Sequence, residues 1–254
     1  MLSGNSVKIS GQRIGYHINQ NSANLFAAME RLASGLRINR ASDDPAGLVI
    51  SEQLRAQIGS MNQEIENISA NINKYHTADS MAGVMRENLI ELRSLAVAAS
   101  NTALNSEEAQ AAYNRSAELM ADSYNRIVAN SEYNGAKLFD GSEGSLADVS
   151  KLTGIDLSDA DSIKASLDII DAAEKELNAA QVEIGSTVKN EFEAERSSLR
   201  IGVQNLTDAE SNLRDTDYVT EYTNFITESF KMKLGMAMLA HSKINAEMVM
   251  KIFG

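Results

Sequence analysis

Apolar residues between positions 54 and 99 recur with the period of a coiled-coil helix. Their spacing alternates between four and three residues, slips once, and then resumes the same alternation. Pro45 suits the first position of a helix and Asp44 suits its N-cap, so the pattern predicts one helix from about 45 to 102. With a rise of ~1.5 Å per residue this helix would be about 85 Å long, which favours a rod over a compact globule. The positions are Leu54, Ile58, Met61, Ile65, Ile68, Ile72 and Tyr75, followed by Met85, Leu89, Leu92, Ala96 and Ala99.

Helical periodicity also marks both ends of the chain and two stretches between them. Asn105 or Ser106 can cap a second helix, a third is predicted from near Asp159 through Leu213, and a last one begins at Tyr218. A helix at the N-terminus is the natural partner of the last one. Apolar seams of this length need partners that bury them, either within the chain or in neighbouring copies. Together with the positions from Leu54 to Ile72, the expected assembly or core seam comprises Leu25, Met29, Leu32, Leu36, Leu206, Leu213, Met238 and Leu239.

The stretch that follows the second helix loses the helical period and contains two turn signals. Asn134-Gly135 and Asp140-Gly141 are pairs typical of type I′ turns, and the residues between them suit a short strand. A β-hairpin is therefore expected near 133–145. The whole pattern predicts a mainly α fold, with long antiparallel helices in a rod-like coiled-coil bundle and one small β-hairpin.

Charge divides the chain into three parts. The net charge is −12 over 254 residues, but residues 1–42 carry five basic residues and one acidic residue. Residues 216–254 carry four of each kind, so residues 43–215 carry a net charge of −16. This shift in composition predicts a boundary near each end of the chain.

Composition and motifs argue against catalysis and metal binding. The chain has no cysteine, which excludes disulfides, thiolate catalysis and most structural zinc sites. No dinucleotide-binding, phosphate-loop or nucleophile-elbow pattern occurs, and His17, His76 and His241 lack the spacing of metal ligands. Asp43-Asp44 could form an acid/base pair, but capping of the following helix is the simpler interpretation. We therefore expect no enzyme, no cofactor and no bound metal.

The same composition bears on the class of partner. An acidic chain repels nucleic-acid backbones, and no apolar run approaches the ~18 residues of a membrane span, so neither nucleic-acid binding nor membrane insertion is expected. The first residues show no basic region followed by an apolar core, so we expect no cleavable signal peptide. Methionines gather in the last helix and could form an adaptable binding surface, although ordinary helix packing is the simpler interpretation.

A series of short sequence blocks runs in order over nearly the whole chain. Together these blocks resemble bacterial flagellin, and they are specific enough to make chance a weak explanation. The blocks are LASGLRIN at 32–39, ASDDPAGL at 41–48, SEQLRAQI at 51–58, LRSLAV at 92–97, EYNG at 132–135 with KL at 137–138, NLT at 205–207, AES at 209–211, LRDTD at 213–217 and GMAMLA at 235–240.

The resemblance implies a structural subunit that self-assembles helically into the bacterial flagellar filament and serves motility. It further implies that 1–42 and 216–254 are two halves of a terminal coiled-coil domain, and that 43–215 is the surrounding rod-like helical domain. The implied partners are neighbouring flagellin subunits in a homo-polymer, the flagellar junction and cap proteins, and an export chaperone at about 216–254. The implied location is secreted, in an extracellular flagellum or in one that is sheathed or periplasmic.

Two departures from the family pattern limit what the resemblance implies. Only about 139–161 is available where longer flagellins insert outer domains, so we expect a near-minimal flagellin. Glu91 stands before Leu92-Arg93, where the motif read by innate flagellin receptors has an arginine, so weak recognition by such receptors is expected. The alternatives are a hook–filament junction protein of the flagellum and a monomeric helical binding module.

Overall fold

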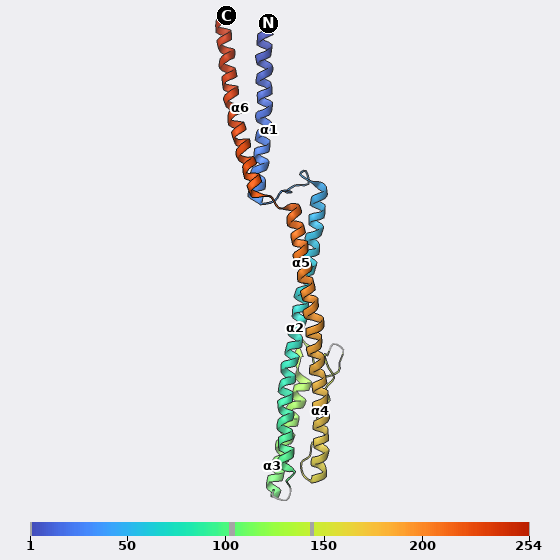
Figure 1. Ribbon diagram of the computed structural model, residues 1–254. Helices are drawn as coiled ribbons and strands as arrows, with labels where there is room; N and C mark the ends of the chain where they lie inside the picture. Colours follow the sequence, from blue (N-terminus) through green and yellow to red (C-terminus); the bar gives the residue numbers. More distant parts are fainter. Residues whose placement is uncertain (1, 102–104, 143–144, 254) are drawn as a thin grey trace. The chain divides into compact units, whose positions relative to one another are not determined.

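The protein is mainly helical (Figure 1) in a computed structural model that describes residues 2–101, 105–142 and 145–253. This confirms the predicted fold class of long antiparallel helices with one small β-hairpin. The predicted end of the long helix at 102 lies outside the described residues. In chain order the elements are α1 (Leu2–Ser34), α2 (Pro45–Ala99), α3 (Glu107–Asn130), β1 (Glu132–Tyr133), β2 (Ala136–Lys137), α4 (Ala160–Thr187), the π-helical turn η1 (Val188–Phe192), α5 (Glu193–Arg214) and α6 (Tyr218–Phe253).

The chain forms two compact units. One consists of residues 61–202 and is called the middle unit here; the other consists of residues 1–60 and 203–254 and is called the terminal unit. The helices α2 and α5 contribute residues to both units. The boundaries near 42 and 215, which the charge pattern suggests, stay a prediction.

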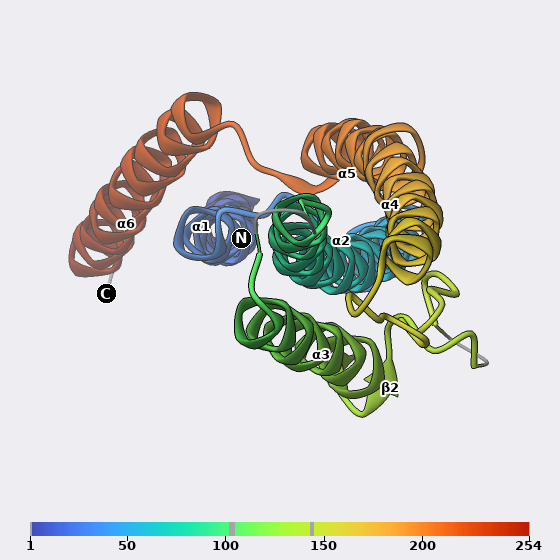
Figure 2. The same cartoon turned by 90° about the horizontal axis from the view of Figure 1, so that it is seen from below.

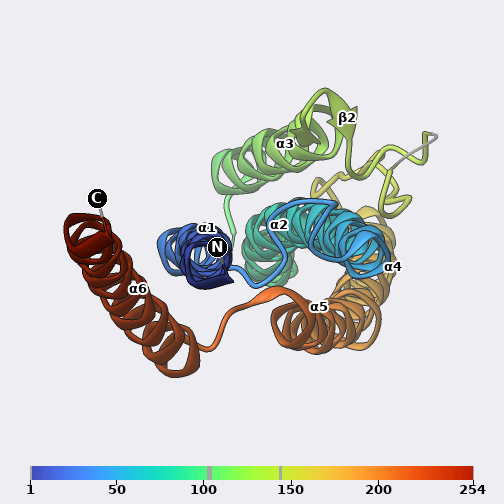
Figure 3. The same cartoon turned by 90° about the horizontal axis from the view of Figure 1, so that it is seen from above.

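The middle unit is built around its own apolar core. Figures 2 and 3 look along the helices and show α3 and α4 against different sides of α2. The loops that follow β2 close the core by burying Leu138 and Phe139. Arg93 of α2 pairs with Glu174 of α4 at 2.9 Å between Nη1 and Oε2, and also with Asp171. The largest fully buried side chains of the helices are Met85, Leu89, Leu92, Tyr124, Ile170 and Leu177.

The hairpin contains one of the two predicted type I′ turns. Asn134 and Gly135 both have positive φ, 52° and 80°, and the antiparallel register pairs Tyr133 with Ala136. The prediction for Asp140-Gly141 is wrong, because only the glycine there has a positive φ. The Asp140 carboxylate instead accepts hydrogen bonds from the backbone N–H and the hydroxyl of Ser142, which is the geometry of an Asx turn.

A single π-helical turn joins α4 and α5 into one continuous helix. Apolar positions lie seven residues apart before this turn and again after it, but eight residues separate Ile184 from Phe192. The extra residue is absorbed by η1, in which the N–H of Glu193 bonds the carbonyl of Val188 five residues earlier. Phe192 contacts the ring of Tyr75 edge to face, with centroids 5.1 Å apart. The π turn therefore keeps one apolar seam on one face. The seam runs through Ile170, Leu177 and Ile184, and then through Phe192, Leu199, Leu206 and Leu213.

Candidate assembly surface

The helices α1 and α6 of the terminal unit lie side by side and antiparallel (Figure 1). A Cβ atom built on Gly235 would lie 2.8 Å from Cγ1 of Ile18, so the two helices approach closely at this glycine. Nearer the other end of the pair, Nη1 of Arg31 lies 3.4 Å from Oε1 of Glu221, and the Glu221 side chain is buried. These contacts set the register of the pair.

The contact between α1 and α6 buries little apolar surface. Among the side chains that are described on these two helices, Ala28 is the one apolar residue that is buried. The others that face the partner helix are half-buried: Ile14, Ile18, Leu25 and Leu32 on α1, and Phe225, Met232 and Leu239 on α6. Such a pair excludes water on one narrow strip only.

A second set of apolar side chains on α6 is left uncovered by the residues that the structure describes. Five apolar side chains follow one another every four residues, and each is between 48% and 61% exposed. Residues spaced by four form a continuous ridge on a helix, which is the feature that packs into the groove of another helix. Each four-residue step turns by about 40°, so this ridge winds by about 160° around α6, and a helix that is apolar over so much of its circumference is normally buried. This uncovered ridge consists of Tyr222, Ile226, Phe230, Leu234 and Met238.

Two chain segments join the terminal helices to α2 and α5, and they run side by side. They consist of residues 35–44 and 215–217 and are together called the crossing here. Leu36 and Asp215 form an antiparallel bridge, in which the N–H of Arg37 donates to the carbonyl of Arg214 at 2.6 Å. Before the bridge, Gly35 ends α1 with a φ of 74°, and a Cβ atom there would lie 2.9 Å from Oη of Tyr218. The turn at this position therefore requires glycine.

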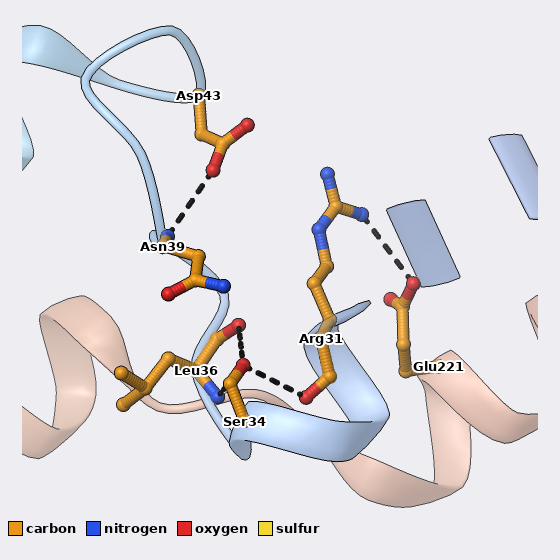
Figure 4. A network of polar contacts seen from close by, with 6 residues as sticks. All are labelled: Arg31, Ser34, Leu36, Asn39, Asp43 and Glu221. Carbon is orange, nitrogen blue, oxygen red and sulfur yellow. Dashed lines mark hydrogen bonds and ion pairs between the residues drawn. The ribbon is translucent and has the colours of Figure 1, made fainter. Parts of the chain in front are cut away.

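Polar side chains order the segment that leads from α1 to α2 (Figure 4). Oδ2 of Asp43 accepts hydrogen bonds from the backbone N–H groups of Arg40 and Asn39, at 2.9 and 3.1 Å. The bond from the Arg40 N–H is the largest cause that lowers the pKa of Asp43 below its ordinary value. Ser34 links the end of α1 to the bridge, since its hydroxyl accepts from the N–H of Leu36 at 3.2 Å.

Two aspartates cap the helices that leave the crossing. Oδ1 of Asp44 accepts from the N–H of Gly47 at 2.9 Å, in the helix that begins at Pro45. Asp217 accepts from the hydroxyl of Thr220 at 2.8 Å and from the N–H of Val219 at 2.9 Å. Hydrogen bonds from Thr220 are the main cause of the lowered pKa of Asp217. Both Asp43 and Asp44 thus bind backbone N–H groups.

A largely buried arginine, which the sequence reasoning did not single out, lies beside the crossing. The Arg214 side chain is 11% exposed, and its Nη1 lies 2.8 Å from Oε1 of Glu52 on α2. This hydrogen bond is the largest cause of the lowered pKa of Glu52. The guanidinium of Arg37 donates to the carbonyl of Leu213 at 2.6 Å. The LRDTD block at 213–217 was the available signal, but the sequence does not show which carboxylate 162 residues away would pair with its arginine.

The predicted seam residues differ in burial along the chain. Ile68 and Ile72 are buried against Val188, whereas Met29 and Met238 are exposed. The remaining predicted positions are half-buried: Leu25, Leu32, Leu36, Leu54, Ile58, Met61, Ile65, Leu206, Leu213 and Leu239. The seam is thus closed at Ile68 and Ile72 of the middle unit, and it is half covered or exposed at the other predicted positions.

The described part of the chain contains no cluster suited to a metal ion and no helix suited to spanning a membrane. His17, His76 and His241 are all exposed and lie on three different helices. Within residues 2–101, 105–142 and 145–253, no cluster of three His, Asp or Glu side chains could hold a metal ion. Nor does any helix in these ranges combine the length and apolarity needed to cross a membrane.

Comparison with known proteins places both halves of the chain in one sequence family. Residues 9–144 match the family described as the bacterial flagellin N-terminal helical region, and residues 167–253 match the bacterial flagellin C-terminal helical region. A flagellin of Halalkalibacterium halodurans is 31% identical, over 95% of this chain and 94% of the relative. A flagellin of Bacillus subtilis is 26% identical over 92% and 95%. The flagellar filament 33 kDa core protein of Treponema phagedenis is 25% identical over 88% and 90%.

Proposed function

Because this chain belongs to the bacterial flagellin family, we propose that it is a structural subunit that self-assembles helically into the bacterial flagellar filament. The observation that carries this proposal is the uncovered ridge of α6, from Tyr222 to Met238. In a helical polymer every subunit has identical neighbours, so the same contact can bury the exposed ridge of each copy.

The energetic argument for assembly rests on exposed apolar area. Fully burying a large apolar side chain contributes ~1.5–3 kcal/mol, and the five ridge residues are only about half buried. Covering their remaining surface would therefore add roughly 1 kcal/mol for each side chain and each subunit. This gain is available only when a second copy lies against α6.

The domain roles are proposed from the family resemblance. The two halves at 1–42 and 216–254 would complete a terminal coiled-coil domain beside neighbouring copies, and 43–215 would form the rod-like domain around it. The two alternatives, a hook–filament junction protein and a monomeric helical binding module, are not favoured by family models and relatives that are flagellins and filament core proteins. A structural role of this kind needs no catalytic group, cofactor or metal.

Further partners are proposed from the family resemblance. A flagellar cap protein and the junction proteins would contact the ends of the polymer, and an export chaperone would bind the segment 216–254 before assembly. An apolar groove lined by Leu32, Tyr218, Val219, Tyr222 and Thr223 lies at the start of this segment, and it would offer such a chaperone or a neighbouring subunit a place to dock. The subunit would be secreted and would reside in an external filament, or in one that is sheathed or periplasmic.

Recognition by innate flagellin receptors is proposed to be weak. Glu91 is exposed on α2 and precedes Leu92, which is fully buried, and Arg93, which is engaged by Asp171 and Glu174. Such receptors bind flagellins that carry an arginine at this position. A carboxylate there loses the ion pair with the receptor and adds repulsion between like charges. A receptor reporter assay should give a weak response to the wild-type protein and a stronger one to Glu91→Arg.

Seeded polymerisation tests the proposed function directly. Purified protein is added to short filament fragments and elongation is followed by light scattering and electron microscopy. Phe230→Asp places a charge in the middle of the ridge and should abolish elongation, whereas the matched variant Phe230→Leu should retain it. Both variants should keep the helical signal of the middle unit. A wild-type protein that stays monomeric under all seeding conditions would overturn the proposal.

A further inference from the structure

The methionines of the chain differ sharply in exposure. Met29 on α1 and Met236 and Met238 on α6 are 48%, 49% and 61% exposed, and all three belong to the terminal unit. In the middle unit Met85 is fully buried and Met81 is 37% exposed. Among the methionines whose side chains the structure describes, the most exposed therefore lie on the helices that the proposed assembly would cover.

We propose that Met238 is a redox-sensitive modification site, at which oxidation by a peroxide prevents the free subunit from assembling. This inference rests on the proposed function, because it assumes that a second copy covers α6. The peroxide transfers one oxygen atom to the thioether sulfur. The sulfur loses two electrons and becomes a sulfoxide, and hydrogen peroxide is reduced to water, so no other co-reactant is needed.

The consequence of oxidation follows from the position of Met238 at the end of the ridge. It continues the four-residue spacing of Phe230 and Leu234, so a neighbour that covers these residues also covers its sulfur. A sulfoxide there is a strong hydrogen-bond acceptor that loses water on burial and meets apolar side chains instead. The site thus distinguishes two states, since the thioether is open in the free subunit and closed in the filament.

The first experiment maps oxidation without depending on assembly. The full-length free subunit is treated with dilute hydrogen peroxide, and the sulfoxide at each methionine is quantified by peptide mass spectrometry. Met238 and Met236 should oxidise at least about tenfold faster than Met85, with Met81 between them. Equal rates at Met238 and Met85 would overturn the inference.

The second experiment reads out assembly position by position. Partly oxidised subunits are seeded, filaments are separated from unassembled protein, and the sulfoxide content of each methionine is compared between the two fractions. Sulfoxide at Met238 should be depleted at least about tenfold from the filaments, whereas sulfoxide at Met81 should divide evenly. Equal content at Met238 in both fractions would overturn the inference while leaving filament formation itself intact.

Substitutions separate the sulfur chemistry from the surface itself. Met238→Gln carries a polar group of similar length and should raise the critical concentration without any peroxide, whereas Met238→Leu should assemble normally. The double variant Met236→Leu and Met238→Leu should lose less activity in assembly after peroxide treatment than wild type. If untreated wild type fails to polymerise, the proposed function fails; if Met238→Gln assembles as well as Met238→Leu, only this inference fails.

Discussion

The middle and terminal units use similar amphipathic helices but complete them differently. The middle unit buries both sides of its seam, with Leu89 of α2, Tyr124 of α3 and Ile170 of α4 all fully buried. In the terminal unit α1 and α6 cover only one face of each other, and Phe26 and Phe230 remain more than 60% exposed. The same heptad pattern of apolar residues therefore gives a buried core in the middle unit. In the terminal unit it gives an exposed apolar surface that needs a neighbouring copy to cover it.

Charge sharpens this contrast. The acidic surplus lies between residues 43 and 215, whereas the ends, which hold α1 and α6, are not acidic. Like charges on neighbouring subunits repel, so an acidic surface suits the part that faces solvent better than the part that packs against a second copy. The exposed apolar ridge and the absence of acidic surplus occur together on α6.

The largest expected effect comes from exchanging one leucine in each unit. Leu89→Ala removes fully buried atoms and should destabilise the middle unit by ~2–5 kcal/mol, as measured by chemical denaturation of the free subunit. Leu234→Ala removes half-exposed atoms and should leave that transition nearly unchanged, while raising the critical concentration for assembly. Similar denaturation losses for the two variants would show that the ridge is already covered in the free subunit.

The crossing between the terminal helices and the rest of the chain should tolerate few changes. Gly35→Ala forces a side chain onto a φ of 74° and against Oη of Tyr218, so it should cost ~1–3 kcal/mol in the terminal unit. Gly135→Ala is the control, because its φ of 80° imposes similar strain but its Cβ would meet open space. Amide exchange should rise at the start of α6 in the first variant and only in the hairpin in the second.

The π turn offers a smaller and more specific test. Deleting Asn190, an exposed residue of η1, should restore regular helix while keeping the seams of α4 and α5 in phase, so stability should change by less than about 1 kcal/mol. Deleting Lys175 from α4 shifts every later seam residue by about 100° and should unfold the middle unit. Thermal unfolding of the two deletions makes the comparison, and equal losses would exclude the one-residue insertion.

Acid should weaken the crossing before it weakens the middle unit. Hydrogen bonds from Thr220 lower the pKa of Asp217 in the folded protein. The ionised carboxylate therefore stabilises the fold above the ordinary aspartate pKa, and this stabilisation is lost as pH falls through the lowered pKa. Asp159 caps α4 and also has a lowered pKa, but its helix is anchored by the buried Ile163. Amide protection near Val219 should therefore fall first on acidification. Asp217→Asn, which caps without titrating, should flatten that dependence.

Periodicity and caps made much of the fold predictable. The helix that begins at Pro45, the cap at Asn105 or Ser106, the helix start near Asp159 and the turn at Asn134-Gly135 were all predicted from local chemistry, since each residue type acts on its own or an adjacent turn. The structure places the cap at Ser106. The turn at Asp140 was misassigned because its side chain competes for the backbone of Ser142.

Long-range partners were beyond the reach of the sequence pattern. Arg214 and Glu52 meet because two segments cross in space, and charge alone offered many equally plausible pairs. The one-residue insertion was visible as eight residues between Ile184 and Phe192, but spacing alone does not say whether the helix kinks, ends or forms a π turn.

The sequence by itself determined that the chain is mainly helical, near which residues the helices after residue 44 begin, and which seam positions are apolar. Only the tertiary structure decided which apolar faces are covered, placing Ile68 in a closed seam and leaving Met238 on an open ridge. The physical reason is that helical periodicity depends on neighbours within a turn, whereas burial depends on which other segment lies against that face. In this protein the ridge that the described residues leave open on α6 is the surface from which assembly is proposed.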